Sequence, residues 1–425
     1  MSRKHFRILA FRQLIFVLPL LAGIPSFSGE PKRTLPNWLE VSGHLDTIHS
    51  IRTKPPHDKI TSRARIRLET RADFKWLYLY CSLDGEKNWT IAKETGTDIR
   101  ECWVEHVDDT WDMRMGRQII IWGQADGVQI TDVISPPDFT ESLTREMDEI
   151  RMPVDAARFR YLGNTFTSEL ILVPVFREAV YPEGDNPWAV SQHAEYQNGI
   201  VFLPADTPDT SFENTEVAFR MSGYFSGLDV AASVFYSWDD TPVLHPVVDA
   251  PNHDDSLILS PRHHRVTIYG LAFSRPWSDF VFRGETAFYR GQRLACDSLT
   301  LEPLVKNLVK WLAGVDWTPG HDWTLTAQLV GESILNHEPV LSAPANRFLC
   351  TLNVSKKLMN ERLTLSNMIY IDCEDSGLYD RIKTDYEVSD GFHLSAGLDI
   401  FQGHKGLFKA YENNSQFWIK AKYNY

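Results

Sequence analysis

The last ten residues, Gln416-Phe417-Trp418-Ile419-Lys420-Ala421-Lys422-Tyr423-Asn424-Tyr425, decide the fold class. Apolar and polar side chains alternate along them, which is the period of a β-strand whose two faces meet different surroundings. Trp418 is the exception, since it falls on the polar face. The segment therefore predicts a two-faced strand that ends at an aromatic residue.

The end of this strand looks like the assembly signal of bacterial outer-membrane barrels, in which an aromatic last residue follows apolar residues at every second position. The residues that form this signal are Phe417, Ile419, Tyr423 and Tyr425. A soluble edge strand shows the same alternation by chance, but rarely at the last residue. The signal implies the barrel assembly machinery and outer-membrane lipids as partners.

The composition is compatible with a barrel and argues against two other classes. The chain has 425 residues, of which 43% are hydrophobic and 23% are charged, with a net charge of -13. An acidic chain argues against nucleic-acid binding, because phosphate contacts usually need a basic surface. A mean hydropathy of -0.27 excludes a polytopic helical membrane protein. A barrel remains compatible, because its lipid-facing and lumen-facing residues alternate and their average looks soluble.

Period-2 alternation recurs along the chain and predicts an all-β fold, a closed antiparallel transmembrane β-barrel. Most segments have about the length that crosses an outer membrane at a tilt. The predicted strands are 38–48, 60–72, 74–84, 98–107, 110–122, 154–162, 165–175, 213–224, 227–238, 263–274, 278–290, 309–318, 321–332, 346–356, 361–372, 377–387, 390–401 and 414–425. This count is 18, which is even as bacterial barrels require, and a count of 16 stays open.

Short and long connections alternate between the predicted strands. The short ones contain the Asp, Gly, Asn and Pro residues that tight turns favour, as at Gly163-Asn164 and Pro319-Gly320. The long ones include 123–153, 176–212 and 239–262. Long extracellular loops and short periplasmic turns are typical of outer-membrane barrels, whereas a sandwich has no reason to alternate in this way.

The N-terminus predicts export. Basic residues from Arg3 to Arg12 precede an apolar run at 14–24, and Ser26 and Ser28 place small residues where a signal peptidase reads them. The run is about half the length of a spanning helix, which argues against a permanent membrane anchor. We therefore predict a signal peptide at 1–28, a single barrel domain at 29–425 and a location in the bacterial outer membrane.

The cysteines predict neither a zinc site nor a disulfide framework. Their number is odd and no CxxC spacing occurs among Cys81, Cys102, Cys296, Cys350 and Cys373. Cys81 and Cys102 fall on strands expected to be neighbours, so a disulfide between them stays open.

A row of arginines gives the best indication of function. Arg63, Arg65, Arg67 and Arg71 share one face of the predicted strand 60–72 with Glu69. Such a row cannot face hydrocarbon cheaply and must line the lumen. The full set of expected pore-lining residues is Arg63, Arg65, Arg67, Arg71, Arg114, Arg158, Arg160, Arg283 and Glu285. Basic rows opposite carboxylates bias which solutes pass, and simple ion pairing between strands is the alternative explanation.

The connection at 123–153 is long enough to have a function of its own. It follows the stretch Gly116-Arg117-Gln118, and its segment Glu141 to Arg151 is charged. We expect the connection to fold back into the barrel and narrow the pore. The residues assigned to this constriction loop are Trp122, Asp126, Asp132, Pro137 and Asp138.

The same stretch resembles a known family, the uncharacterised proteobacterial outer-membrane proteins of domain-of-unknown-function family 1302. The resemblance rests on a GRQ-x-x-x-WG motif at 116–123 that leads through an acidic position to Pro137-Asp138. It extends to 219–224, 227–230 and 236–242, and to Arg283-Gly284-Glu285, and covers the chain from roughly residue 60 to 330. The family has no established activity, so the resemblance implies location and architecture rather than a substrate.

These observations favour a porin-like channel for small solutes over an enzyme. No G-x-S-x-G elbow or His-x-Ser nucleophile stretch occurs, and no cofactor or metal is expected. The alternative is a closed barrel that acts as a binding or structural component of an envelope complex. An outer-membrane hydrolase is a third and weaker interpretation.

Overall fold

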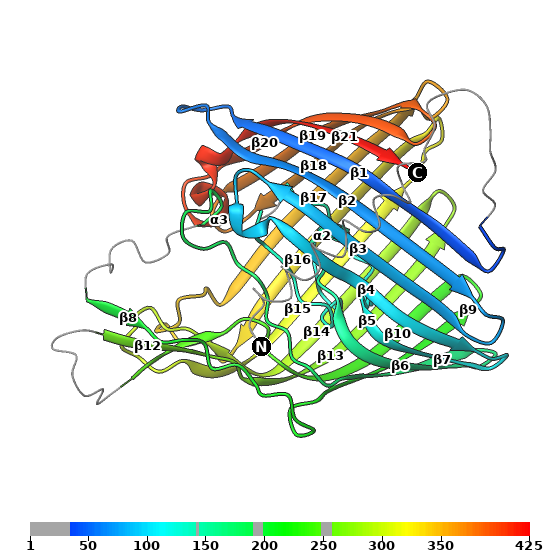
Figure 1. Ribbon diagram of the computed structural model, residues 1–425. Coiled ribbons are helices and arrows are strands. Elements are labelled where there is room, and N and C mark those ends of the chain that lie inside the picture. Colours follow the sequence, from blue (N-terminus) through cyan, green and yellow to red (C-terminus); the bar gives the residue numbers. More distant parts are fainter. Residues whose placement is uncertain (1–34, 142–143, 190–198, 248–256) are drawn as a thin grey trace.

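The computed structural model describes residues 35–141, 144–189, 199–247 and 257–425. Over these residues eighteen antiparallel strands form one sheet that closes on itself, which confirms the predicted fold class and strand count (Figure 1). The strands are β1 Leu39–Arg52, β2 Lys59–Asp73, β3 Tyr78–Asn88, β4 Gly96–Val107, β5 Trp111–Gln118, β6 Val154–Leu162, β7 Phe166–Val173, β9 Glu216–Phe225, β10 Leu228–Trp238, β13 Arg265–Trp277, β14 Phe280–Leu294, β15 Leu304–Trp317, β16 Trp323–Leu335, β17 Asn346–Leu358, β18 Leu363–Asp372, β19 Gly377–Ser389, β20 Phe392–Gln402 and β21 Gln416–Asn424.

The barrel closes between its first and last strands. β1 pairs with β21 and with β2, and Leu45 stands opposite both Tyr423 and Ile66. The three side chains lie on the outer face, where each is more than a third exposed. Closure leaves no unpaired sheet edge. The C-terminal segment is thus the strand that completes the barrel.

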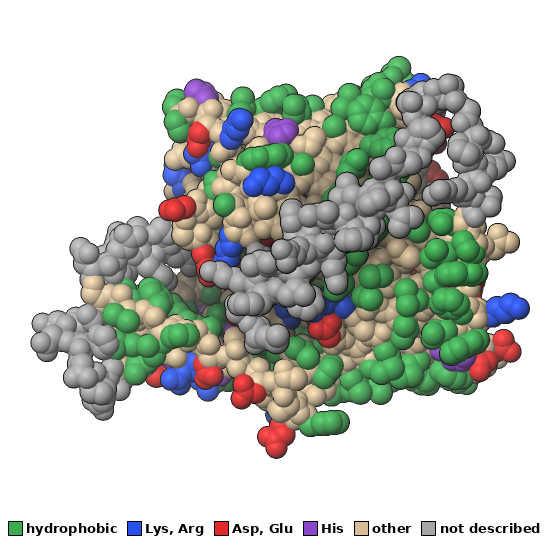
Figure 2. Space-filling view, viewed as in Figure 1, with side chains coloured by type: hydrophobic (Ala, Val, Ile, Leu, Met, Phe, Trp, Pro, Cys, Tyr) green, Lys and Arg blue, Asp and Glu red, His purple; other side chains and the backbone are tan. Residues whose placement is uncertain are grey.

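Alternation along the strands separates an apolar exterior from a polar or covered interior. Hydrophobic side chains gather on the outer face of the strands (Figure 2). Trp418 faces inward and is 2% exposed. A Cβ on Gly397 would lie 2.4 Å from the Trp418 ring, and the Arg381 guanidinium lies 5.2 Å from the ring centroid. Trp418 interrupts the alternation because its indole packs over a glycine inside the barrel.

Several strand bounds differ from the sequence prediction by four or more residues, and those of β5 and β15 have a local structural cause. β5 ends at Gln118 and not at residue 122, because Gly116 has a φ of 128° and the chain then turns inward to bury Ile120. β15 begins at Leu304, five residues earlier than expected at 309. Its early residues continue the hairpin with β14 beyond the bulge that follows Tyr289.

A small second sheet was not predicted. It consists of β8 Ile200–Phe202, β11 Val243–Pro246 and β12 Leu257–Arg262, and it lies at the end of the barrel where the long loops gather (Figure 1). We call this end the loop end and the opposite one the turn end. β8 has three residues and β11 has four, too short for a period-2 pattern to be recognised.

Helices are short in the described part of the chain. They are η1 Ala92–Glu94, α2 Met147–Ile150, α3 Gly406–Ala410 and η4 Glu412–Asn414. None of the described helices is long and apolar enough to cross a membrane. The predicted signal peptide lies outside the described residues. Cys81 and Cys102 stand directly opposite each other on β3 and β4, with both thiols free.

Candidate solute pathway and constriction loop

The segment 119–153, which we call the constriction loop, leaves β5 and folds into the barrel (Figure 1). Hydrogen bonds join its two limbs near the base. The Ile120 amide donates to Ser135 Oγ at 2.9 Å, and the Trp122 amide donates to Asp132 Oδ1 at 3.1 Å. These bonds hold the limbs together as one body inside the lumen.

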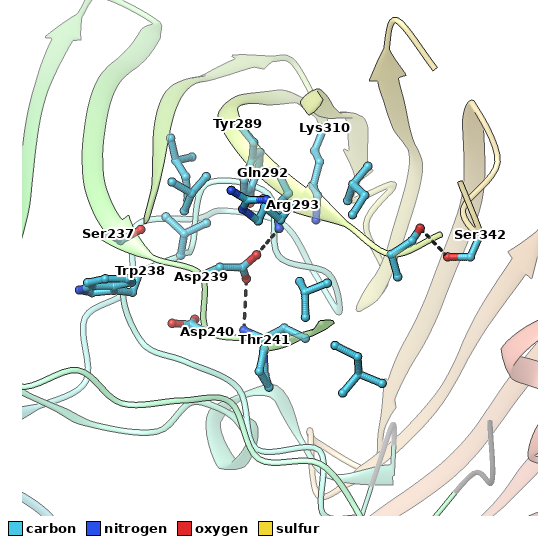
Figure 3. A pocket seen from close by; sticks show the side chains of 18 of the residues that line it. Ser237, Trp238, Asp239, Asp240, Thr241, Tyr289, Gln292, Arg293, Lys310 and Ser342 are labelled. Carbon is cyan, nitrogen blue, oxygen red and sulfur yellow. Dashed lines mark hydrogen bonds between the residues drawn. The ribbon is translucent and has the colours of Figure 1, made fainter. Parts of the chain in front are cut away.

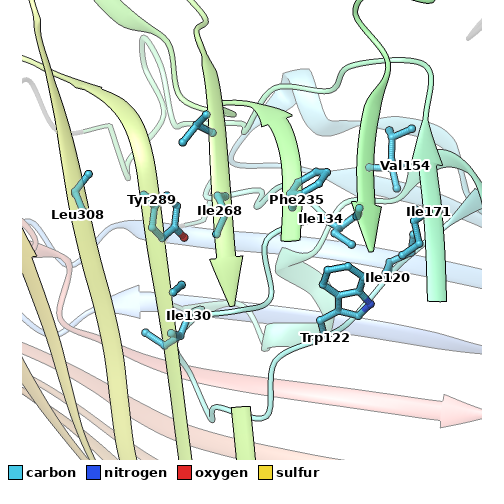
Figure 4. Close-up of a cluster of buried hydrophobic side chains, with 14 of the residues drawn as sticks. Ile120, Trp122, Ile130, Ile134, Val154, Ile171, Phe235, Ile268, Tyr289 and Leu308 are labelled. Carbon is cyan, nitrogen blue, oxygen red and sulfur yellow. The ribbon is translucent and has the colours of Figure 1, made fainter. Parts of the chain in front are cut away.

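One side of the constriction loop packs on an apolar part of the inner wall. Ile120, Trp122, Ile130 and Ile134 are each at most 4% exposed and contact inward-facing side chains (Figure 4). Those wall residues include Val154, Ile171, Phe235, Ile268, Tyr289 and Leu308. The Trp122 indole also donates to Glu169 Oε1 at 2.8 Å. Buried apolar area therefore holds the loop against the strands from β6 to β16.

The tip of the constriction loop is hydrogen-bonded to β14 and β16. Glu285 Oε2 accepts from the Thr131 hydroxyl at 2.8 Å and from the Thr131 amide at 3.2 Å. Arg283 Nη2 donates to Asp126 Oδ2 at 2.7 Å, and the Asp126 amide donates to Gln328 Oε1 at 3.1 Å. Arg283 and Glu285, predicted to line the pore, face the lumen and hold the tip of the loop.

The other side of the constriction loop binds the arginine row. Arg63 Nη2 donates to Glu149 at 2.9 Å and Arg65 Nη2 at 2.6 Å, while Lys420 Nζ lies 3.5 Å away. Burial opposes ionisation of Glu149, but the two guanidinium groups outweigh it and hold the pKa of this carboxyl well below its usual range. Arg63 also lies 3.6 Å from Glu141. The loop thus reaches both walls and crosses the lumen between them.

The remaining predicted pore-lining arginines are paired with carboxylates. Arg67 forms two hydrogen bonds with Asp84, at 2.6 and 2.7 Å, and Arg65 binds Asp46 at 2.9 Å. The other pairs are Arg71 with Glu40 and Glu69, Arg114 and Arg158 with Glu105, and Arg160 with Asp112. These arginines and their carboxylates form a ladder of ion pairs along β2, β5 and β6, which we call the arginine ladder. Ion pairing between strands was the alternative explanation of the arginine row.

Two acidic residues of the constriction loop, Asp132 and Asp138, pair with arginines of the loop itself. Arg151 Nε donates to Asp132 Oδ2 at 2.6 Å, and Arg145 Nη1 donates to Asp138 Oδ2 at 3.2 Å. Pro137 lies opposite Arg151 in an isolated bridge. These side chains shape the loop rather than present free carboxylates to the lumen.

A second segment, around residues 186–188, ties the constriction loop to the opposite rim. Asn186 Nδ2 donates to the Thr140 carbonyl at 2.8 Å. Trp188 is fully buried against Phe401 and Tyr411, with ring centroids 6.0 and 5.6 Å away. The sequence analysis missed Trp188. The available signal was a tryptophan directly after the polar stretch Gly184-Asp185-Asn186-Pro187, where an exposed turn has no need of a large apolar side chain.

A cavity of about 780 Å³ lies between the constriction loop and the wall toward the loop end (Figure 3). Val133, Val266 and Ile268 form apolar parts of its lining, and Lys310 and Asp239 are among the charged ones. Asp239 accepts from the Thr241 amide at 3.1 Å and from the Gln292 side chain. This lining mixes apolar side chains with polar and charged ones in similar measure, which suits a small amphipathic solute.

Two neighbouring carboxyl groups at this cavity, Asp239 and Asp240, have raised pKa values. Burial raises the pKa of Asp239. Burial, together with the carboxylates of Glu216 and Asp239, raises the pKa of Asp240 well above its ordinary value. In the described residues no group of three or more His, Cys, Asp or Glu is placed to hold a metal ion.

A family model matches most of the chain. The family is described as "Protein of unknown function (DUF1302)", and the match covers residues 86–407. This chain belongs to that family. The match confirms the resemblance inferred from the sequence motifs, although it begins later and extends further than the stretch from 60 to 330. Membership assigns no activity, because the family description assigns none.

Solved structures of outer-membrane proteins are similar in fold. The alignment with Salmonella typhi OmpF in complex with Daunomycin covers 91% of this chain and 97% of the OmpF chain, with 9% sequence identity and a TM-score of 0.48. The alignment with the outer membrane channel DcaP of Acinetobacter baumannii covers 91% of this chain and 97% of the DcaP chain, with 10% sequence identity and a TM-score of 0.44. The alignment with a mutant of the Rh. blastica porin covers 91% of this chain and 100% of the porin chain, with 10% sequence identity and a TM-score of 0.43. The search of curated proteins gives no match.

Proposed function

We propose that this protein is a porin-like channel of the bacterial outer membrane that passes small solutes past the constriction loop. The observation that carries the proposal is the loop itself, which crosses the lumen and is held on both inner walls. The apolar exterior of the strands is what a lipid environment requires.

The path runs beside a field of paired charges. On one wall the arginine ladder faces Asp46, Asp84, Glu105 and Asp112. Closely paired charges of both signs make a transverse field that orients dipolar solutes and does not simply admit anions. On the other wall the 780 Å³ cavity offers apolar surface beside charged groups such as Asp239 and Lys310. We therefore expect small amphipathic solutes to be preferred over inorganic ions.

Planar-bilayer recordings of the purified protein test this function. We expect a small conductance in the wild type and a much larger one after removal of residues 123–153. Absence of current from both proteins would contradict the channel and favour a closed barrel that binds envelope partners. That second function has one observation in its favour, the burial of Trp188, which draws a loop across the loop end.

Substitution of the arginine row tests the charge of the path. We expect Arg63, Arg65 and Arg67 replaced together by Ser to shift the reversal potential toward cations, because Glu149, Asp46 and Asp84 lose their counter-charges. Arg275→Ser, an exposed position at the turn end of β13, is the matched control. An unchanged reversal potential in the triple variant would show that these side chains do not border the path.

A further inference from the structure

Three polar side chains lie together on the outer face of β1 and β2, away from the lumen. Thr47 and His49 occupy outward positions between Leu45 and Ile51, which are 47% and 46% exposed. Ser62 stands directly opposite His49 on β2. Polar groups on the lipid-facing side of a barrel are unfavourable unless they are hydrogen-bonded, and these three are joined to one another.

The three side chains form one chain of hydrogen bonds, in which each donates to the next. Thr47 Oγ1 donates its only hydrogen to the Arg63 carbonyl at 3.0 Å. Its contact of 2.9 Å with His49 Nε2 is therefore one in which the imidazole N–H donates. The proton of a neutral ring is then on Nε2, and Nδ1 accepts from the Ser62 hydroxyl at 2.9 Å. A serine on a base that a third group orients is the arrangement of an activated nucleophile.

The serine has access to a cavity at this position. Ser62, His49, Lys59, Trp89 and Thr90 line a space of about 590 Å³. Trp89 follows the end of β3, is 56% exposed, and its ring centroid lies 6.0 Å from that of His49. Lys59 is exposed and supplies a positive charge to the lining of the same cavity. The cavity thus combines a nucleophile, a base and a cation, the parts that acyl transfer requires.

The position of Thr47, His49 and Ser62 along the barrel indicates which substrate they can reach. His49 lies three residues before Arg52, the last residue of β1 at the loop end. If the barrel spans the outer membrane as proposed, this is the level of the outer-leaflet headgroups, where exposed tryptophans such as Trp89 collect. The group within reach at that depth is the carboxyl ester of a membrane lipid.

We propose that Ser62, His49 and Thr47 form a lipid-ester hydrolase site on the outer face of the barrel. Ser62 Oγ attacks the ester carbonyl carbon and its proton passes to His49 Nδ1. The bond from that carbon to the alcohol oxygen breaks, and the lysolipid leaves with the proton from His49. Water, deprotonated by His49, then releases the fatty acid and regenerates Ser62. Thr47 is a positioning residue that fixes the imidazole tautomer.

The full-length protein in mixed micelles with a phospholipid that has a fluorogenic acyl ester tests the site. We expect fatty-acid release by the wild type and its loss by at least about a thousandfold in Ser62→Ala and His49→Ala. Thr70→Ala removes a hydroxyl from the same outer face of β2 and is the matched control, with unchanged release. Ser62→Ala is expected to leave the single-channel conductance unchanged, which separates this site from the proposed channel.

Two further measurements keep the proposal falsifiable if a variant fails to fold. A fluorophosphonate probe is expected to modify Ser62 in the folded wild type, as mapped by mass spectrometry. Thr47→Ser is expected to retain activity, while Thr47→Val lowers kcat with KM unchanged and alters the pH profile. Folded wild type that releases no fatty acid and has no probe on Ser62 would overturn the assignment, as would equal release by Ser62→Ala.

Discussion

The two inner walls of the barrel hold the constriction loop by different means. The wall from β6 to β16 presents Phe235, Ile268 and Leu308 inward and holds the loop mainly by burial of apolar surface, with Arg283 and Glu285 bonded to its tip. The wall at β2 and β21 presents Arg63, Arg65 and Lys420 and holds it through Glu149. Apolar attachment is insensitive to salt and pH, whereas the ionic one depends on the charge state of its members. The loop thus has one mainly apolar attachment and one mainly ionic attachment, and salt and pH act most strongly on the second.

Removal of Trp122 from the apolar attachment has the largest expected effect. Trp122→Ala deletes a side chain that is 4% exposed and should weaken loop docking by about 3–5 kcal/mol. We expect a larger, noisier conductance and new protease cleavage within 119–153. Trp317→Ala, at an outward position that is 40% exposed, is the control and should change neither. Unchanged conductance in Trp122→Ala would mean that the apolar wall does not hold the loop.

Removal of the charge of Glu149 has a smaller effect. Glu149→Gln keeps the shape but leaves Arg63 and Arg65 with a weaker acceptor, which costs about 1.5–3 kcal/mol of docking. We expect brief openings whose duration depends less on salt than in the wild type, because the ion pairs of Glu149 are gone. Glu183→Gln, whose carboxylate is 78% exposed, is the control. A closed state as stable in Glu149→Gln as in the wild type would contradict the ionic attachment.

The sign of the pH effect follows from the lowered pKa of Glu149. Its ionised form stabilises the folded loop, and this contribution is complete above the unfolded value of 4.5 and is lost as the pH falls through the lower folded value. Wild-type conductance should therefore be constant from neutral pH to about pH 5 and rise only in stronger acid. In Glu149→Gln this acid rise should be absent.

The strands of the barrel were predictable because each has two different surroundings. In β20, Leu394, Ala396 and Leu398 face outward and alternate with Ser395 and Asp399, so the pattern alone locates the strand. The same reasoning located the arginine row and its orientation, since hydrocarbon excludes charge on one face. Local alternation therefore contains most of the information that defines this fold.

The partners across the lumen were not predictable, because nothing local specifies them. Arg63 and Glu149 are 86 residues apart, and a charged loop segment has many equivalent acceptors in the sequence. The apolar wall did leave a signal that was not used. Val266 and Ile268 face inward while Tyr269 and Leu271 face outward, so β13 is apolar on both faces. In a barrel whose interior is wet, such a strand indicates that something covers its inner face.

Two partly buried carboxyls sharpen the contrast between the walls. Glu149 sits among cations and its pKa is lowered, whereas Asp240 sits beside the carboxylates of Glu216 and Asp239 and its pKa is raised. A raised folded pKa means that the folded state binds the proton more tightly than the unfolded state does. Stability therefore falls as the pH rises from about 4 through the folded value. Ionised Asp240 thus opposes folding near neutral pH, while ionised Glu149 favours it.

Asp240→Asn is the smallest of these tests and isolates that contribution. The neutral amide removes the ionisable group, so we expect a slightly higher thermal midpoint at pH 8, little change at pH 4, and a flatter dependence of the midpoint on pH. Heat-modifiable migration of the barrel at the two pH values measures both midpoints. Asp209→Asn, at an exposed loop position, is the control and should follow the wild type. A midpoint of Asp240→Asn that falls at pH 8 would mean that the ionised carboxylate has a favourable partner there, and the two walls would then treat a carboxylate alike.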